Sequence, residues 1–408
     1  MSNAAISPID AVARALDRRT EANHRFFTAE SERTARLCHG MAERFARGGR
    51  LIALGSSPQA SSDVRHVAVE FVHPVIVGKR ALPAIGLTGE GGALALQAQL
   101  LARPDDIVIG YGVDEGERGL ELALAWAREH GCLTISYART GAAEWECEPP
   151  SEDAFVRQEL VETHYHVLWE LVHVFFEHRG LLKGREARPV HDTGASSFLY
   201  PFLAEREHDL EAVVADVRRS IEMKSQEVGA LREQTLTENR QVLERAARAL
   251  GGRFAAGGKL LALGNGGSAT DAMDAVADFR IPPTSNGAPA AWPPRPAIDL
   301  TEDSAILTAI ANDIGTEEIF QRQVIAYGEQ GDILLALSTS GNSANVISAL
   351  AEARKRELET IAMVGYDGGR VASEGLADHV VITRSQHIPR IQEAQASAYH
   401  VLRELVES

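Results

Sequence analysis

Short apolar runs alternate with amphipathic helical patterns along the whole chain. In the first half the runs read LIALG, LPAIGLT, DIVIGYG and LTISYA, and in the second half they read LLALG, PAIDLT, DILLALS, TIAMVG and HVVIT. Strands buried on both faces of a sheet produce such runs, and strands that alternate with helices of about 10–15 residues indicate βαβ units. The pattern therefore predicts an α/β architecture with parallel sheets.

Two pairs of segments indicate that the halves repeat each other. The segment MAERFARGGRLIALGSS, which contains Gly55, is similar to AARALGGRFAAGGKLLALGNGGS, which contains Gly264. The segment RQELVETHYHVLWELV, from Arg157, is similar to RIQEAQASAYHVLRELV, from Arg390. The order of the segments is the same in both halves, so the repeat predicts two domains of related fold.

The length of 408 residues agrees with two domains, because single hydrophobic cores rarely grow beyond about 250–300 residues. We assign residues 1–180 to the first domain and residues 205–408 to the second. We expect the segment 181–204 to be a linker, because it breaks the strand and helix pattern. Residues 179–202 read RGLLKGREARPVHDTGASSFLYPF.

Composition narrows the possible partners. The formal net charge of −16 opposes binding to a nucleic-acid backbone, although it does not exclude a small phosphorylated ligand. The chain contains no apolar run of about 18 residues and no basic start followed by an apolar stretch, so we expect neither a membrane span nor a secretory signal. Its three cysteines have no paired spacing, which favours a cytoplasmic protein with reduced thiols.

The second half carries a turn suited to phosphate. In GDILLALSTSGNSANVI an apolar strand leads into a hydroxyl-rich turn and then directly into a helix. Hydroxyl groups and free backbone N–H groups at a helix N-terminus bind phosphate, although the same residues also cap helices that bind nothing. A glycine-rich turn, GNGGS, follows the first strand of this half, and both turns are expected at the carboxyl edge of one sheet.

Five ordered blocks give the second half a resemblance to phosphoheptose isomerases, over roughly residues 205–408. The blocks are GNGGSATDAMDAVADF, ANDIGTEEIF, STSGNSANVI, GYDGGRVA and RIQEAQASAYH. The resemblance implies two sugar isomerase (SIS) domains in tandem, each a flavodoxin-like three-layer sandwich with a five-stranded parallel sheet. It also implies that the substrate is bound by Asn265, Ser268, Asn312, Asp313, Ser338, Thr339, Ser340, Ser343 and Gln392.

Members of that family hold zinc with a His-x3-Glu pair on one helix and a Gln-x7-His pair on another. The second half keeps Gln392 and His400, but Asp274 and Asp278 occupy the His-x3-Glu positions. The first half keeps all four residue types, so the resemblance implies a zinc site there, and its ligands are His66, Glu70, Gln158 and His166. The acid–base residues that it implies for the two halves are Glu70, His166, Asp278 and His400.

The first half lacks the phosphate turn. Where the second half reads ALSTSGNSAN, the first reads VIGYGVDEGERG, so Tyr111, Val113, Asp114 and Glu115 replace the hydroxyl groups, and the two acids would repel phosphate. The first half also has no counterpart of the segment ANDIG of the second half. Each half thus keeps a different part of the expected site, and a composite site built from both halves is one possible outcome.

Two functions remain open from the sequence. The first is an aldose–ketose isomerase that acts on a phosphorylated sugar of the sedoheptulose 7-phosphate type. The second is a non-catalytic regulatory or assembly protein that binds a phosphorylated sugar, because mismatched halves also result when catalysis is lost. The resemblance further implies a homo-oligomer, in which a dimer of this double-length chain mimics an SIS tetramer.

Overall fold

A computed structural model describes residues 8–75, 79–89, 93–112, 118–177, 182, 209–283 and 292–408. Contacts divide the chain into two compact units, each of which contains one parallel sheet. The first-sheet unit consists of residues 22–151 and 160–226. The second-sheet unit consists of residues 1–21, 152–159 and 227–408.

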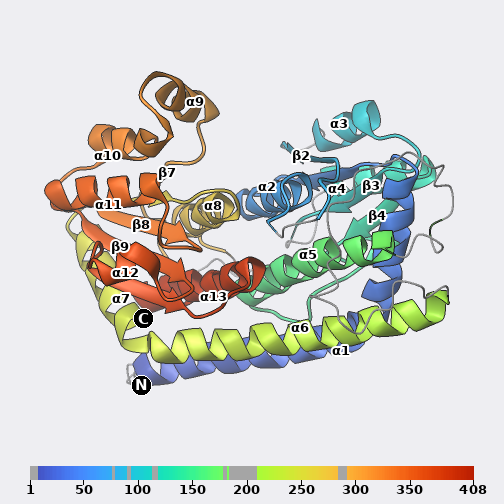
Figure 1. Cartoon of the computed structure of the whole chain (residues 1–408), viewed down its shortest axis with the longest axis horizontal. Helices are drawn as coiled ribbons and strands as arrows, with labels where there is room; N and C mark the ends of the chain where they lie inside the picture. Colours follow the sequence, from blue (N-terminus) through green and yellow to red (C-terminus); the bar gives the residue numbers. More distant parts are fainter. Residues whose placement is uncertain are drawn as a thin grey trace. The chain divides into compact units, whose positions relative to one another are not determined.

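The first sheet has the strand order β2-β1-β3-β4-β5, with every pair parallel (Figure 1). Its strands are β1 (Leu51–Gly55), β2 (Ala84–Thr88), β3 (Ile107–Gly110), β4 (Leu133–Ser136) and β5 (Trp145–Glu146). The helices that follow these strands are α2 (Pro58–Val72), α3 (Ala93–Leu101), α4 (Arg118–Glu129) and α5 (Ala154–Glu177). All residues of β1, β3 and β4 are buried, which explains why these strands read as continuous apolar runs.

The second sheet has the order β10-β9-β8-β6-β7 and is also parallel throughout. Its strands are β6 (Leu260–Leu263), β7 (Ala297–Asp299), β8 (Ile333–Ser338), β9 (Glu359–Gly365) and β10 (His379–Thr383). Its helices are α7 (Arg240–Ala255), α8 (Gly267–Arg280), α9 (Ser304–Asp313), the 3-10 helix η3 (Thr316–Glu318), α10 (Gln321–Tyr327), α11 (Ala344–Lys355), α12 (Gly369–Ser373) and α13 (Ile388–Val406).

Two hydrophobic clusters show that helices cover both faces of the second sheet. Side chains of a strand point alternately to opposite faces. In β6, Leu260 and Ala262 belong to a cluster with residues of α7, α8 and α13, whereas Leu261 and Leu263 belong to a cluster with residues of α10, α11 and α12. The second-sheet unit is therefore a three-layer sandwich.

Numbered within its own half, each sheet has the order 2-1-3-4-5, which is the flavodoxin-like order. The prediction of two α/β domains with five-stranded parallel sheets is confirmed. In such an order the crevice between the first and third strands, β6 and β8 in the second sheet, is where open α/β folds bind ligands.

Three helices contain the borders between the two units, so the units differ from the division predicted at residues 181–204. The helix α1 (Pro8–Ala46) begins in the second-sheet unit, and α6 (Leu210–Glu238) ends there. Within the first-sheet unit α1 and α6 lie side by side, and Asn23 donates a hydrogen bond to the backbone of Ser225 (Figure 1). Apart from Leu182, the predicted linker lies outside the described residues.

Candidate functional site

The hydroxyl-rich turn lies between β8 and α11. Ser338 ends the strand, and its hydroxyl accepts a hydrogen bond from the amide of Gly341 at 3.2 Å. Its oxygen also lies 3.5 Å from the hydroxyl oxygen of Ser343. Ser343 occupies the N-cap position of α11, but its side chain makes no capping hydrogen bond to the described helix. The turn therefore gathers hydroxyl groups at a helix N-terminus without using Ser343 as a cap.

The glycine-rich turn meets the hydroxyl-rich turn through a pair of amides. Asn265 donates a hydrogen bond to Asn345 at 2.9 Å, and Asn345 donates one back at the same distance. Gly264 allows α8 to start close to β6, since a Cβ atom there would lie 2.2 Å from the carbonyl oxygen of Ser268. The expectation that the two turns lie together at one edge of the sheet is met, and they lie at the β6–β8 crevice.

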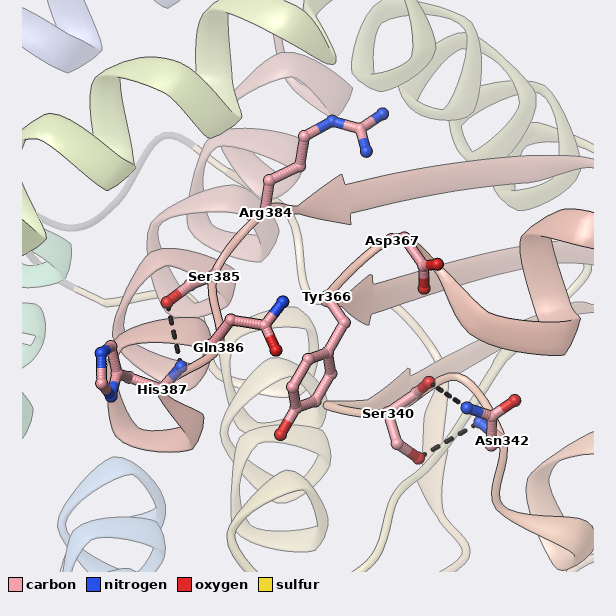
Figure 2. Close-up of a pocket in the computed structure, with 8 residues that line it drawn as sticks. All are labelled: Ser340, Asn342, Tyr366, Asp367, Arg384, Ser385, Gln386 and His387. Atoms are coloured by element: carbon pink, nitrogen blue, oxygen red, sulfur yellow. Dashed lines mark hydrogen bonds between the residues drawn. The ribbon is translucent and has the colours of Figure 1, made fainter.

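A pocket of about 790 Å³ lies at the carboxyl ends of β8, β9 and β10. It shares Ser340 and Asn342 with the hydroxyl-rich turn, and Asn342 donates to the carbonyl of Ser340 (Figure 2). Its remaining lining residues are Tyr366, Asp367, Arg384, Ser385, Gln386 and His387. Sequence reasoning named none of these six as site residues. Tyr366 and Asp367 do lie in the block GYDGGRVA, whereas the four residues after β10 belong to none of the five blocks.

Two of the predicted substrate residues lie on the surface. Asn312 and Asp313 end α9, both are exposed, and Asn312 donates to Asp313 at 2.8 Å. Thr339 is half-buried, and its carbonyl accepts a hydrogen bond from Gly365. Gln392 is buried in α13, on the same helix as His400.

A buried charged cluster occupies the second-sheet unit, and His400 is at its centre. Its Nε2 atom lies 3.3 Å from an oxygen of Asp274 and 3.4 Å from an oxygen of Asp278. Its Nδ1 atom lies 2.9 Å from Glu159, a residue of α5. Gln158, also on α5, donates to Asp274 at 2.7 Å. The three groups Asp274, Asp278 and His400 are close enough to hold a metal ion.

The charged neighbours of His400 and Glu159 shift the pKa values of these two side chains. Burial alone would lower the pKa of His400, but the neighbouring carboxyl groups of Asp274, Asp278 and Glu159 raise that pKa well above its ordinary value. Burial likewise opposes ionisation of Glu159, but the Arg19 guanidinium and His400 hold the pKa of that carboxyl far below its usual range. The carboxyl groups around the ring therefore favour the protonated form of His400.

A second buried cluster lies in the first-sheet unit and consists of His66, Glu70, Glu162 and His166. The Nε2 atoms of the two histidines lie 3.3 Å apart, and Glu70 lies 3.9 Å from His66. One ligand atom from each of His66, Glu162 and His166 falls within 4.8 Å of the others. Burial, followed by the neighbouring charge of His166, lowers the pKa of His66 well below its ordinary value, so the ring stays neutral. Two imidazole nitrogens and carboxylate oxygens are a ligand set that zinc accepts.

The four predicted zinc ligands are divided between the two clusters. His66, Glu70 and His166 come together, whereas Gln158 belongs to the second-sheet unit and binds Asp274. The residue that joins the histidines instead is Glu162. The sequence did contain a signal for it, because Glu162 and His166 are four residues apart and such residues share one face of a helix.

The described part of the chain contains no helix that is long and apolar enough to cross a membrane. Of the first half's replacement turn, Tyr111 is described and buried, whereas Val113, Asp114 and Glu115 lie outside the described residues.

Comparisons with known proteins agree with this architecture. The profile of a family described as SIS domain matches residues 225–365. The C-terminal domain of glucosamine-fructose-6-phosphate aminotransferase from Francisella tularensis superposes with a TM-score of 0.60 at 8% identity, covering 100% of this chain and 97% of that one. The tagatose-6-phosphate ketose/aldose isomerase from Escherichia coli gives a TM-score of 0.54 at 11% identity, covering 97% and 93%. Identities this low show the fold alone, and these matches agree with two α/β domains of this fold along the chain.

A closer relationship comes from sequence. A phosphoheptose isomerase from Chlorobium phaeobacteroides is 47% identical over 178 residues, which make up 43% of this chain and 76% of that protein. The blocks that carry the resemblance include the two turns and helices α8 and α13. The chain therefore belongs to the phosphoheptose isomerase family.

Proposed function

We propose that this protein is an aldose–ketose isomerase that acts on a phosphorylated sugar of the sedoheptulose 7-phosphate type. The observation that carries the proposal is the hydroxyl-rich turn before α11, which the Asn265–Asn345 amide pair joins to the turn that opens α8. The same helix α8 carries Asp274 and Asp278. Relatives named phosphoheptose isomerase support the substrate class.

The turn supplies the phosphate contacts. Hydroxyl groups of Ser338, Ser340 and Ser343 donate to phosphate oxygens, and the N-terminus of α11 adds backbone N–H groups and a favourable dipole. Ser268 and Asn265 come from the neighbouring turn, in the same crevice. This local arrangement binds an anion even though the whole chain carries a charge of −16.

Aldose–ketose isomerisation moves a proton between two adjacent carbons and also shifts a proton between their oxygens. A carboxylate takes and returns the carbon-bound proton, and a protonated histidine donates a hydrogen bond to the carbonyl oxygen. Asp278 and His400 fill these roles in the second-sheet unit. Glu70 and His166 are the corresponding pair in the first-sheet unit.

The residues that would hold zinc are His66, Glu70, Glu162 and His166. When bound, the ion supplies Lewis-acid polarisation of a carbonyl or hydroxyl oxygen. Metal binding requires that both His66 and His166 present neutral nitrogens to it. Gln158, which was part of the set predicted from the sequence, instead holds Asp274.

Deuterium exchange tests the isomerase. The protein is incubated with sedoheptulose 7-phosphate in D₂O, and NMR follows deuterium incorporation at C1 and the appearance of the aldose. We expect both with the unaltered protein and neither with Ser340→Asp, because its carboxylate would face the phosphate charge. The control is Ser373→Asp, which changes an exposed serine of α12.

A second function is favoured by one observation, namely that both ring nitrogens of His400 are already held by carboxylates. A site held in this way suits a non-catalytic regulatory or assembly protein that binds a phosphorylated sugar. Sugar-phosphate binding in calorimetry without any deuterium exchange would establish this function and exclude the isomerase. If Ser340→Asp bound the sugar phosphate with unchanged affinity, the turn would serve only to cap the N-terminus of α11.

Two further proposals concern the setting of the protein. We propose that it works in the cytoplasm, where its substrate class and three unpaired, buried cysteines are expected. We also propose that it forms a homo-oligomer, as a dimer of the double-length chain. Size-exclusion chromatography with light scattering tests the assembly, and a monomer at micromolar concentration would contradict it.

A further inference from the structure

Glu159 is a first-repeat residue that lies inside the second-sheet unit. It sits near the start of α5, its side chain is 1% exposed, and its Oε1 atom is 2.9 Å from Nδ1 of His400. An ionised carboxylate only accepts hydrogen bonds, so the Nδ1 atom of His400 must carry a proton. The opposite ring atom, Nε2, then faces Asp274 and Asp278.

Two further groups hold the Glu159 carboxylate in place. Arg19 of α1 donates from Nε to both carboxylate oxygens, at 2.9 and 3.0 Å. Ser397 of α13 donates to Oε2 at 2.5 Å. Both partners are buried, so the carboxylate is fixed from two helices besides its own.

The ring of His400 is also held on its face. Phe155, one turn before Glu159 on α5, stacks on the imidazole with a centroid distance of 4.5 Å and an interplanar angle of 15°. The first-repeat segment 152–159 therefore constrains both the rotation and the tilt of a second-repeat histidine. A histidine gripped at Nδ1 by a carboxylate presents Nε2 in a fixed direction, which is how acid–base histidines are oriented.

We infer that Glu159 is a positioning residue for His400, supplied by the first repeat to the site of the second. Its catalytic meaning rests on the proposed isomerase function, whereas the hydrogen bond itself does not. The first repeat thereby contributes a residue to the second site, although its own sequence has no hydroxyl-rich turn.

The kinetic experiment compares Glu159→Gln with Glu404→Gln in the full chain. Glu404 also pairs with Arg19, at 3.2 Å, and is therefore the matched control for losing a partner of that arginine. Glu159→Gln is expected to lower kcat about 100-fold, as a small misplacement of a reacting group does, while KM stays within about twofold. Glu404→Gln is expected to keep kcat within about threefold. A Glu159→Gln protein with unchanged kcat, or with a loss confined to KM, would overturn the inference.

A spectroscopic measurement decides the inference even if no sugar phosphate is isomerised. In protein with ¹⁵N-labelled histidine, the Nδ1 proton of His400, assigned by its loss in His400→Asn, is expected far downfield because its acceptor is charged. The resonance should move upfield in Glu159→Gln and stay in place in Glu404→Gln. If Glu159→Gln does not fold because Arg19 loses its charged partner, Arg19→Met/Glu159→Gln replaces it. A wild-type proton found on Nε2 alone, or a resonance unmoved by either Glu159 variant, would refute the positioning role.

Discussion

Gly264→Ala is a sharp test of how the two turns are built. A Cβ atom at this position would lie 2.2 Å from the carbonyl oxygen of Ser268 and 2.5 Å from its carbonyl carbon. Real Cβ atoms essentially never come within 3.0 Å of another heavy atom, so β6 and the start of α8 must separate by roughly 1 Å. Overpacking of this kind costs about 1–3 kcal/mol, so we expect the free energy of unfolding to fall by about 2 kcal/mol.

The same shift should weaken phosphate binding, because it moves Ser268 and the Asn265–Asn345 pair. Loss of one hydrogen bond to a charged group is worth about 1.5–3 kcal/mol, which corresponds to roughly a 10- to 100-fold weaker affinity. Urea unfolding measures the first effect, and calorimetry with inorganic phosphate measures the second.

Gly252→Ala is the matched control. Gly252 lies in α7, has no atom within 4 Å of a Cβ atom built on it, and is exposed. Alanine should stabilise the helix there by about 0.5–1 kcal/mol and leave phosphate affinity unchanged. If Gly264→Ala matched wild type in both measurements, the reasoning about the close approach of α8 would be refuted.

Two other predictions concern histidines of the first-sheet unit. His66→Ala should lose bound zinc and Asp274→Ala should retain it, as metal analysis of the purified proteins would show; the opposite result would mean that the metal belongs to the second repeat. His164 is bonded to Thr34 and Tyr137, and burial lowers its pKa from 6.5 to about 3. The neutral ring is favoured by folding, so the stability it contributes is complete above pH 6.5 and is lost as the pH falls towards 3, by up to about 1.4 kcal/mol per pH unit. In urea unfolding at about pH 7 and pH 4, His164→Asn should flatten this decline, and an unchanged slope would contradict the assignment.

The apolar pattern was sufficient to predict most of the fold. Strands β1, β3, β4 and β8 are buried along their whole length, and burial on both faces leaves an apolar run that can be read directly. The strand β5 escaped prediction because it is only two residues, Trp145–Glu146, and two residues carry no period.

The site was predictable where its chemistry is local in sequence. The hydroxyl-rich turn follows from a short motif, and the structure brings its hydroxyl groups together. His66 and His166 are 100 residues apart and were paired only by the family resemblance, and the structure brings their nitrogens together. The part played by Glu159 was not predictable, because its partners Arg19 and His400 are 140 residues before it and 241 residues after it. The hydrogen bond from Gln158 to Asp274 was not predictable either, because 116 residues separate them.

The membership of residues 1–21 in the second-sheet unit has a consequence for how the chain is made. Arg18 and Arg19 pair with Glu404, and 385 residues separate Arg19 from this partner in sequence. At about 5–20 residues per second, translation of the intervening chain takes roughly 20–80 s. During that time the start of α1 has been synthesised but its final partners have not. The second-sheet unit therefore cannot form these ion pairs until Glu404 has been synthesised, and a ribosome that stalls before that residue would leave Arg19 without Glu404.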